Sequence, residues 1–135
     1  MSTQSITATG TTVQSRSLTQ VIRLDAVASG ALGVVLLGAG WALDGPLGLP
    51  TALSVGAGAF LLAWTAALLL IARGPAMKRT AVLEVIGVNA VWVAASLAAL
   101  VTVDLTGLGI AFVLAQAAAV GVFTELQVTA LRKAH

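Results

Sequence analysis

The sequence contains no cysteine and no tyrosine, and its one histidine, His135, is the last residue. Without cysteine the chain can form no disulfide, iron–sulfur cluster or thiolate metal site. A haem held by two histidines of one chain is excluded as well. No nucleophile–base pair and no phosphate-binding loop can be assembled from the remaining residues. These absences predict a protein that is not an enzyme, with no catalytic residues, no metal site and no cofactor.

Charged residues are also scarce. They make up 9% of the chain, whereas 59% of the residues are hydrophobic, and soluble domains average about 25% charged residues. An ordinary water-soluble domain is therefore excluded. The net charge of +2 rests on few cations, with no basic cluster interleaved with aromatic residues, so nucleic acid is not an expected partner. The expected partner is the lipid bilayer.

Long hydrophobic runs are abundant. A hydrocarbon layer of about 30 Å requires about 20 helical residues at 1.5 Å each. Four runs reach this length, at about 25–43, 51–72, 81–103 and 107–127. They are too long and too continuously apolar for the strands of a membrane barrel. The predicted fold class is therefore all-α, an integral membrane four-helix bundle.

Short connections rich in Gly and Pro separate the runs, at 44–50, 73–80 and 104–107. Consecutive helices should therefore be antiparallel neighbours. Residues 1–20 are rich in Ser and Thr and lack aliphatic clusters, which predicts a disordered cytoplasmic tail before a membrane domain at 21–135. This tail lacks the regions of a cleaved signal peptide, so we expect the first span to be retained.

All Lys and Arg residues fall on one side of this layout. They precede the first span, lie between the second and third, or follow the fourth: Arg16, Arg23, Arg73, Lys78, Arg79, Arg132 and Lys133. An excess of positive residues is typical of the cytoplasmic side of a membrane protein. Both termini are therefore predicted to be cytoplasmic.

The two halves of the chain align with an offset of 59 to 60 residues, which places Asp25 on Glu84 and Asp44 on Asp104. Each half begins on the same side, so a duplicated helical hairpin would be a parallel repeat with its axis along the membrane normal. The alternative is that any two helical hairpins of equal length align this well. The alignment alone leaves both interpretations open.

Three acids lie near the cytoplasmic ends of the predicted spans. We expect Asp25, Glu84 and Glu125 to be interfacial carboxylates rather than charges at the bilayer centre. Asp25 would then pair with Arg23 and Glu125 with Arg132, and Glu84 could reach Lys78, Arg79 or Arg132. Proton or ion coupling and contact with a partner protein are the alternatives.

Two amides, Asn89 and Gln116, lie deeper in the spans. Asn89 points about 140° away from Glu84 on a helix, so these two residues do not form one site. A buried amide requires a partner. The predicted intramembrane contacts are Asn89 with Gln116, or bonds from either amide to Ser29 or Thr65. Such contacts would hold the helices together, and the alternative is that they line a path for a substrate or ion.

Small residues recur at four-residue spacing, which allows close approach of membrane helices. The candidate helix-packing residues are Gly30, Gly33, Gly58, Ala90, Ala94 and Gly121. Four helices cannot use every such face internally. This pattern predicts a homo-oligomer or a membrane protein partner.

Three segments carry a resemblance to a known group of proteins. They are R-L-D-A-x-x-S-G at 23–30, N-x-x-W at 89–92 and the L-R-K tail at 131–133. In these segments the chain resembles small uncharacterised four-helix integral membrane proteins of the actinobacterial type, from about residue 20 to the end. The resemblance implies a multi-pass protein of the bacterial plasma membrane and implies no activity.

Two functions of different classes follow. The first is a structural or accessory membrane protein that associates with itself or a partner through small-residue helix faces. The alternative is an oligomeric transporter of a small solute or ion. In the transporter, Asp25, Glu84 and Glu125 would lie at the cytoplasmic mouth, with Asn89 and Gln116 along the path.

Overall fold

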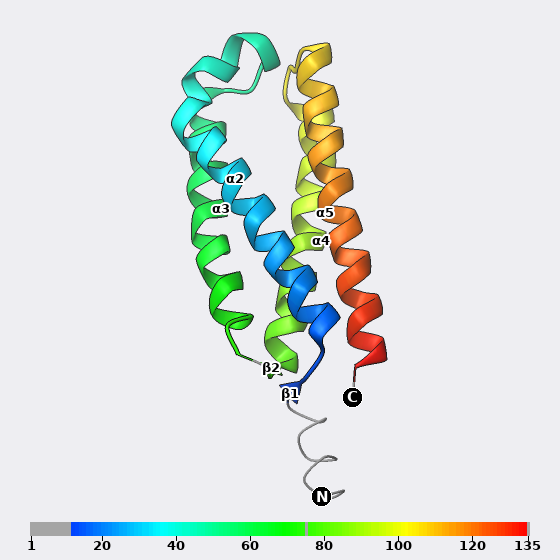
Figure 1. Cartoon of the computed structure of the whole chain (residues 1–135). Helices are drawn as coiled ribbons and strands as arrows, with labels where there is room; N and C mark the ends of the chain where they lie inside the picture. Colours follow the sequence, from blue (N-terminus) through cyan, green and yellow to red (C-terminus); the bar gives the residue numbers. More distant parts are fainter. Residues whose placement is uncertain (1–11, 75, 135) are drawn as a thin grey trace, which may run out of the picture.

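The computed structural model describes residues 12–74 and 76–134 (Figure 1). Its main elements are the helices α2 (Arg16–Leu47), α3 (Thr51–Ile71), α4 (Arg79–Thr102) and α5 (Gly107–Lys133). All four of these helices are long and apolar enough to cross a membrane. The prediction of an all-helical chain with four helices of this kind is confirmed.

The prediction of a disordered tail is wrong for residues 12–20. Thr12–Val13 form a short strand, β1, and α2 begins at Arg16 instead of near Asp25. Ser15 caps this helix, because its hydroxyl accepts a hydrogen bond from the backbone N–H of Leu18 at 3.2 Å. The polar residues that suggested disorder therefore include a helix start. The rest of the predicted tail, residues 1–11, lies outside the described residues.

The other helix boundaries follow the predicted spans with two extensions. α5 continues through Lys133, beyond the predicted end at 127. The prediction ended early because the last turns carry polar residues, which lower the hydropathy. At the other end of the molecule α2 also runs past its predicted end at 43, through Pro46 to Leu47. Gly48 then ends the helix with a φ of 73°, the left-handed conformation that glycine adopts without strain.

One end of the molecule holds β1, the last turn of α5 and the α3–α4 connection, and we call it the termini end (Figure 1). There β1 pairs antiparallel with β2 (Met77–Lys78), with Val13 opposite Met77. A buried apolar cluster surrounds this strand pair: Val13, Leu18, Ile22, Ala26, Leu68, Ala72, Met77, Val82, Val85, Ala130 and Leu131. This cluster closes the termini end of the helix assembly.

The opposite end, which we call the far end, is closed by contacts between the two connecting loops. The hydroxyl of Thr106 donates to the backbone oxygen of Pro46 at 2.7 Å, and its N–H donates to the oxygen of Leu47 at 3.1 Å. Gly48 packs beside the same loop, where an added Cβ would lie 2.8 Å from the backbone oxygen of Asp104. The end of α2 is therefore joined to the α4–α5 connection.

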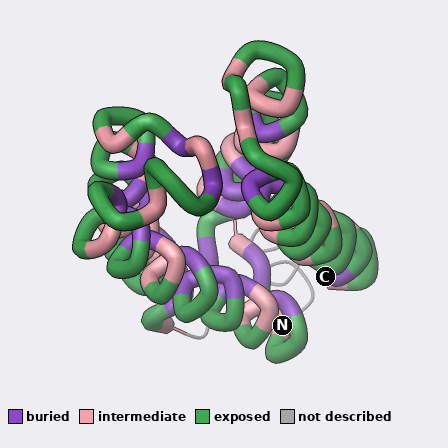
Figure 2. The backbone as a smooth tube through the Cα atoms, turned by 90° about the horizontal axis from the view of Figure 1, so that it is seen from above, coloured by how far each residue is buried: buried purple, intermediate pink, exposed green. Residues whose placement is uncertain are grey.

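The helices form two pairs that differ in how closely they pack. α2 packs along α3, α4 along α5, and α2 against α5, whereas α3 and α4 meet at few positions. Figure 2 shows the buried residues on the sides of the helices that face inward and the exposed residues around the outside. Large exposed apolar side chains such as Val27, Trp41 and Val91 give this outer surface the character that lipid accommodates.

Three of the predicted helix-packing residues lie at the α2–α3 contact. A Cβ added at Gly58 would lie 2.6 Å from the backbone nitrogen of Leu37, and one added at Gly33 would lie 3.1 Å from the oxygen of Gly58. Gly30 lies against the side chain of Thr65. These glycines allow the two helix backbones to approach.

The other three predicted packing residues are not used in this way. Ala90 and Ala94 are exposed on the outside of α4. A Cβ added at Gly121 would meet nothing within 4 Å.

Candidate functional site

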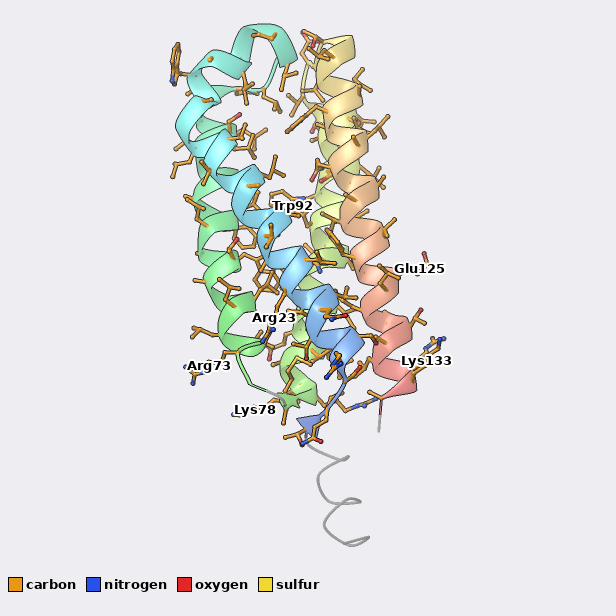
Figure 3. The ribbon with its side chains drawn as sticks, viewed as in Figure 1. Arg23, Arg73, Lys78, Trp92, Glu125 and Lys133 are labelled. Carbon is orange, nitrogen blue, oxygen red and sulfur yellow. The ribbon has the colours of Figure 1, made fainter. Side chains whose placement is uncertain are left out.

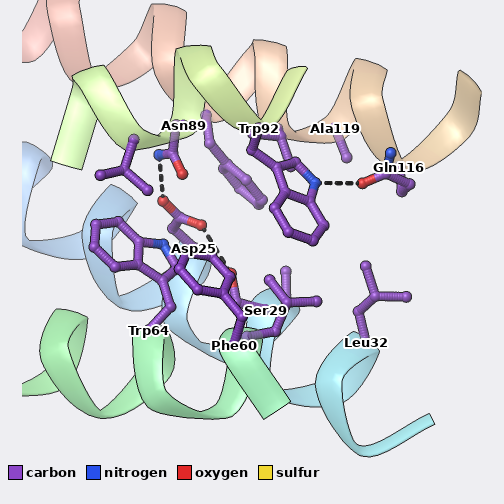
Figure 4. Close-up of a pocket in the computed structure, with 14 residues that line it drawn as sticks. Asp25, Ser29, Leu32, Phe60, Trp64, Asn89, Trp92, Gln116 and Ala119 are labelled. Carbon is purple, nitrogen blue, oxygen red and sulfur yellow. Dashed lines mark hydrogen bonds between the residues drawn. The ribbon is translucent and has the colours of Figure 1, made fainter. Parts of the chain in front are cut away.

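A buried carboxylate connects three of the helices. Asp25 of α2 is only 1% exposed. Its Oδ2 accepts hydrogen bonds from Asn89 Nδ2 at 2.8 Å and from Gln127 Nε2 at 2.9 Å. Its Oδ1 accepts a bond from the hydroxyl of Ser29 at 3.2 Å (Figure 4). We call Asp25, Ser29, Asn89 and Gln127 the polar cluster.

The two amides of the polar cluster also bond to each other, because Asn89 Nδ2 donates to Gln127 Oε1 at 3.0 Å. Asp25, Asn89 and Gln127 therefore form a closed ring of hydrogen bonds that joins α2, α4 and α5. A ring of this kind fixes the carboxylate in one orientation.

The prediction that Asp25 pairs with Arg23 is wrong, and Asp25 is buried between the helices. The Arg23 guanidinium donates to the backbone oxygen of Ala72 at 2.9 Å. Within the described part of the chain, Asp25 has only neutral hydrogen-bond donors and no ion pair with Lys or Arg. α2 begins at Arg16, so Asp25 lies inside the helix rather than at its start, and its side chain bonds to α4 and α5.

Glu84 and Glu125 have different surroundings from Asp25. Both are exposed, and neither side chain takes part in a hydrogen bond or ion pair among residues 12–74 and 76–134. The predicted pairs of Glu84 with Lys78, Arg79 or Arg132, and of Glu125 with Arg132, are therefore not formed there. The alignment of the two halves places Asp25 on Glu84, yet only the first is buried, so these two positions are not equivalent.

The predicted contact between Asn89 and Gln116 is also wrong. Gln116 Oε1 accepts a bond from the indole N–H of Trp92 at 2.8 Å, and its Nε2 donates to Ser96 Oγ at 2.8 Å. Because α4 and α5 run antiparallel, positions further along α4 meet positions earlier in α5. Asn89 is therefore level with Gln127, and Gln116 is level with the next turns of α4.

The two hydroxyls predicted to bond to these amides have other partners. Ser29 donates to Asp25, as described above. Thr65 of α3 donates to the backbone oxygen of Leu61 at 2.8 Å and lies 3.4 Å from the backbone oxygen of Ala26 in α2. Thr65 thus contributes to the α2–α3 contact and not to the polar cluster.

A cavity of about 180 Å³ lies beside the polar cluster, and we call it the inner chamber. Residues of all four helices line it, including Asp25 and Asn89. Three of its aromatic rings are stacked nearly parallel: the centroid of Phe60 lies 6.3 Å from that of Trp64 and 5.8 Å from that of Trp92. This aromatic stack joins α3 to α4 at the side where these helices otherwise make few contacts.

A second cavity of about 170 Å³, the apolar chamber, continues toward the far end. It shares Leu32, Trp92 and Gln116 with the inner chamber, and most of its other lining side chains are aliphatic or aromatic. Ser54 also lines it. The buried Ser54 hydroxyl has no hydrogen-bond partner within the described part of the chain.

Several residues of the site were not among the predicted site residues: Gln127, Trp92, Ser96, Phe60 and Trp64. A signal for the first three was present in the sequence. Gln127 shares a helix face with Gln116, and Trp92 and Ser96 share one with Asn89. The α3 aromatic residues carried no such signal, because an aromatic side chain in an apolar helix is ordinary core.

The described residues hold no group of three or more His, Cys, Asp or Glu side chains that could bind a metal ion. No protein-family model, curated protein or solved structure matches the chain.

Proposed function

We propose that this is a multi-pass protein of a bacterial plasma membrane that binds a small amphiphilic molecule in its two chambers. The observation that supports this most directly is a cavity of about 180 Å³ with a buried carboxylate in its wall. Ligand sites are typically mostly apolar cavities with a few convergent polar groups. The inner chamber has this composition.

We also propose that both termini are cytoplasmic. The labelled basic residues Arg23, Arg73, Lys78 and Lys133 gather at the termini end (Figure 3). The two connections at the far end contain no Lys or Arg. An excess of positive residues on one side is characteristic of the cytoplasmic side.

In this proposal the molecule enters from the lipid, between α3 and α4. The apolar cluster closes the termini end and the joined loops close the far end. On the α3–α4 side the helices make few contacts, and Phe60 of the aromatic stack is 45% exposed. Movement of this ring away from Trp92 would open the inner chamber sideways. A continuous pore between the two ends is not supported by this arrangement.

The proposal keeps the handling of a small solute that the sequence suggested, but it moves the acidic group from the cytoplasmic mouth to the interior of the molecule. Asp25 takes this role from inside the molecule, whereas Glu84 and Glu125 face outward. Release on either side of the membrane would require one of the closed ends to open.

An accessory role is the second candidate, and one observation favours it. Ala90 and Ala94 are exposed on the outside of α4, so their small-residue face is open to another helix. This face could bind a second copy of the chain or a membrane protein partner.

Binding in the chambers can be tested by blocking them. Ala119 lines the inner chamber, whereas its neighbour Ala118 is equally exposed but lines neither chamber. The probes are octyltrimethylammonium, octanol and octanoate, measured by titration calorimetry with the protein in lipid nanodiscs, and empty nanodiscs correct for partitioning. At least one probe should bind saturably. Ala119→Phe should weaken that binding about tenfold or more, a loss of only about 1.4 kcal/mol.

Ala118→Phe is the control and should change the affinity less than about twofold, since it adds the same ring outside the chamber. If no probe binds saturably, or if both variants weaken binding equally, the proposed function is wrong.

A further inference from the structure

We infer that the amphiphile is an organic cation, with its ammonium group beside Asp25 and its apolar tail in the apolar chamber. This inference depends on the proposed function, because it names the ligand class of the same site.

The charge of the site favours a cation. Asp25 is 1% exposed, and its three side-chain partners are the neutral groups of Ser29, Asn89 and Gln127. A charged side chain inside an apolar interior is costly unless an opposite charge compensates it. The nearest basic residue in the sequence, Arg23, bonds to the backbone of α3 instead. A ligand that carries a positive charge would supply the missing compensation.

The carboxylate of Asp25 can also accept a further hydrogen bond. The amides of Asn89 and Gln127 both bond to Oδ2, whereas Oδ1 accepts one bond, from Ser29. A carboxylate has about four lone-pair sites on its two oxygens. Oδ1 therefore retains acceptor capacity, and Asp25 and Ser29 both line the inner chamber.

The aromatic side chains that line the inner chamber also favour a cation. Phe60, Trp64 and Trp92 all line the inner chamber, with ring planes within 10° of each other in both stacked pairs. The face of an aromatic ring, of tryptophan above all, attracts a cation within about 6 Å of its centroid. Aromatic faces beside a carboxylate are the usual surroundings of a bound alkylammonium group.

The two chambers together favour a cation with a tail. They share Leu32 and Trp92, so a chain that starts beside Asp25 can continue into the apolar chamber. That chamber offers aliphatic side chains such as Leu36 and Leu53. A small inorganic cation would leave this space empty. It would also need several oxygen ligands, and the described residues contain no cluster of three acidic or histidine side chains.

The test compares head groups of different charge on the same octyl chain, with the protein in nanodiscs. Octyltrimethylammonium should bind the wild-type protein about tenfold or more tightly than octanol, and octanoate should bind weakest, because Asp25 repels it. Asp25→Asn should remove the preference for the cation, leaving the cation and octanol within about twofold of each other. Glu84→Gln removes a carboxylate outside the chambers and should leave the preference unchanged.

Trp64→Leu is a second variant that leaves the hydrogen bonds of the polar cluster in place. It should weaken binding of the cation by about threefold or more and change octanol binding little, because only the cation is attracted to the ring face. Trp64→Leu tests the preference for a cation even if Asp25→Asn does not fold. If all three probes bind equally well and Ala119→Phe still blocks them, the inference is wrong and the chamber function stands. If octyltrimethylammonium binds the wild-type protein no more tightly than octanol after correction for partitioning, the inference is also wrong.

Discussion

At the scale of single residues, the main feature is a carboxylate held by neutral donors. Each interhelical hydrogen bond of this kind contributes about 0.6 kcal/mol in membrane proteins, and at most about 1.7 kcal/mol. At this typical value, the two interhelical bonds to Asp25, from Asn89 and Gln127, contribute less than the cost of burying an unpaired charge, which is about 2.5 kcal/mol or more at the centre of a membrane helix. In the proposed function, a bound cation supplies the missing compensation.

The ring of hydrogen bonds makes a prediction about stability at Gln127. Gln127→Leu removes the bonds to Asp25 and Asn89. It should lower the free energy of unfolding by about 1–2 kcal/mol, because two interhelical bonds are lost and a carboxylate loses a donor. Unfolding in mixed detergent–SDS micelles, followed by circular dichroism, measures this.

Gln20→Leu is the matched control, since Gln20 is exposed on α2 and its side chain has no hydrogen bond among the described residues. Equal stability of the two variants would show that the ring contributes nothing.

At the scale of the helices, the two interfaces of α3 are built differently. Toward α2 it presents glycine, and the backbones approach closely at Gly33 and Gly58. Toward α4 it presents Phe60, whose ring stacks on Trp92. Large rings hold two helices apart, whereas glycines bring them together. The first interface is therefore closely packed, and the second leaves room for a chamber.

The glycine contact makes a prediction about α3. A Cβ added at Gly58 would lie 2.6 Å from the Leu37 nitrogen and 2.8 Å from the Gly33 oxygen. Gly58→Ala should therefore destabilise the protein by about 1–3 kcal/mol, because neither backbone atom can move without shifting a helix.

Gly56→Ala in the same helix is the control, because a Cβ at Gly56 meets nothing within 4 Å. It should stabilise the protein by up to about 1 kcal/mol through the better helix propensity of alanine. The same micelle unfolding assay measures both variants. Destabilisation by Gly56→Ala to the same extent would contradict the packing explanation.

At the scale of the whole molecule, the structure is closed at both ends, and between them the α3–α4 side is packed less closely than the α2–α3 side. The apolar cluster closes one end and the loop bonds of Thr106 close the other. The chambers lie between, on the α3–α4 side. A molecule of this shape can hold a ligand inside the membrane without forming a continuous water path.

The outward face of α4 makes a prediction about self-association. If a second copy packs there, Ala94→Leu should weaken the dimer about tenfold or more, because the larger side chain keeps the two helix backbones apart. Energy transfer between labelled copies in liposomes, at varied protein-to-lipid ratio, measures this.

Ala118→Leu makes the same change on the exposed surface of α5 and should leave association unchanged. Wild-type energy transfer no higher than random proximity would rule out the self-association form of the accessory role and leave a partner protein as its remaining form.

The number of long apolar helices could be predicted from the sequence, because length and hydropathy are local properties of each run. The start of α2 could not be predicted in this way. Its first turns at 16–20 are polar, and they are helical because Ser15 caps them and Leu18 packs in the core. For the same reason Asp25 lies inside α2 and not at its start.

The hydrogen-bond partners of the polar side chains could not be predicted from the sequence either. The sequence identified Asn89 and Gln116 as buried amides, and both do form hydrogen bonds to side chains of other helices. Which side chains those are depends on the register of α4 against α5. Register is a property of two helices together, so no pattern within one of them could reveal that Asn89 meets Gln127.

The sequence by itself determined the helical class, the four apolar spans and the gathering of positive charge at one end, because each follows from composition along a single segment. Only the tertiary structure decided that Asp25, Asn89 and Gln127 meet, that α3 and α4 remain apart, and that a chamber lies between them. Segments far apart in the chain are brought together by packing, and the free energy of packing depends on all four helices at once.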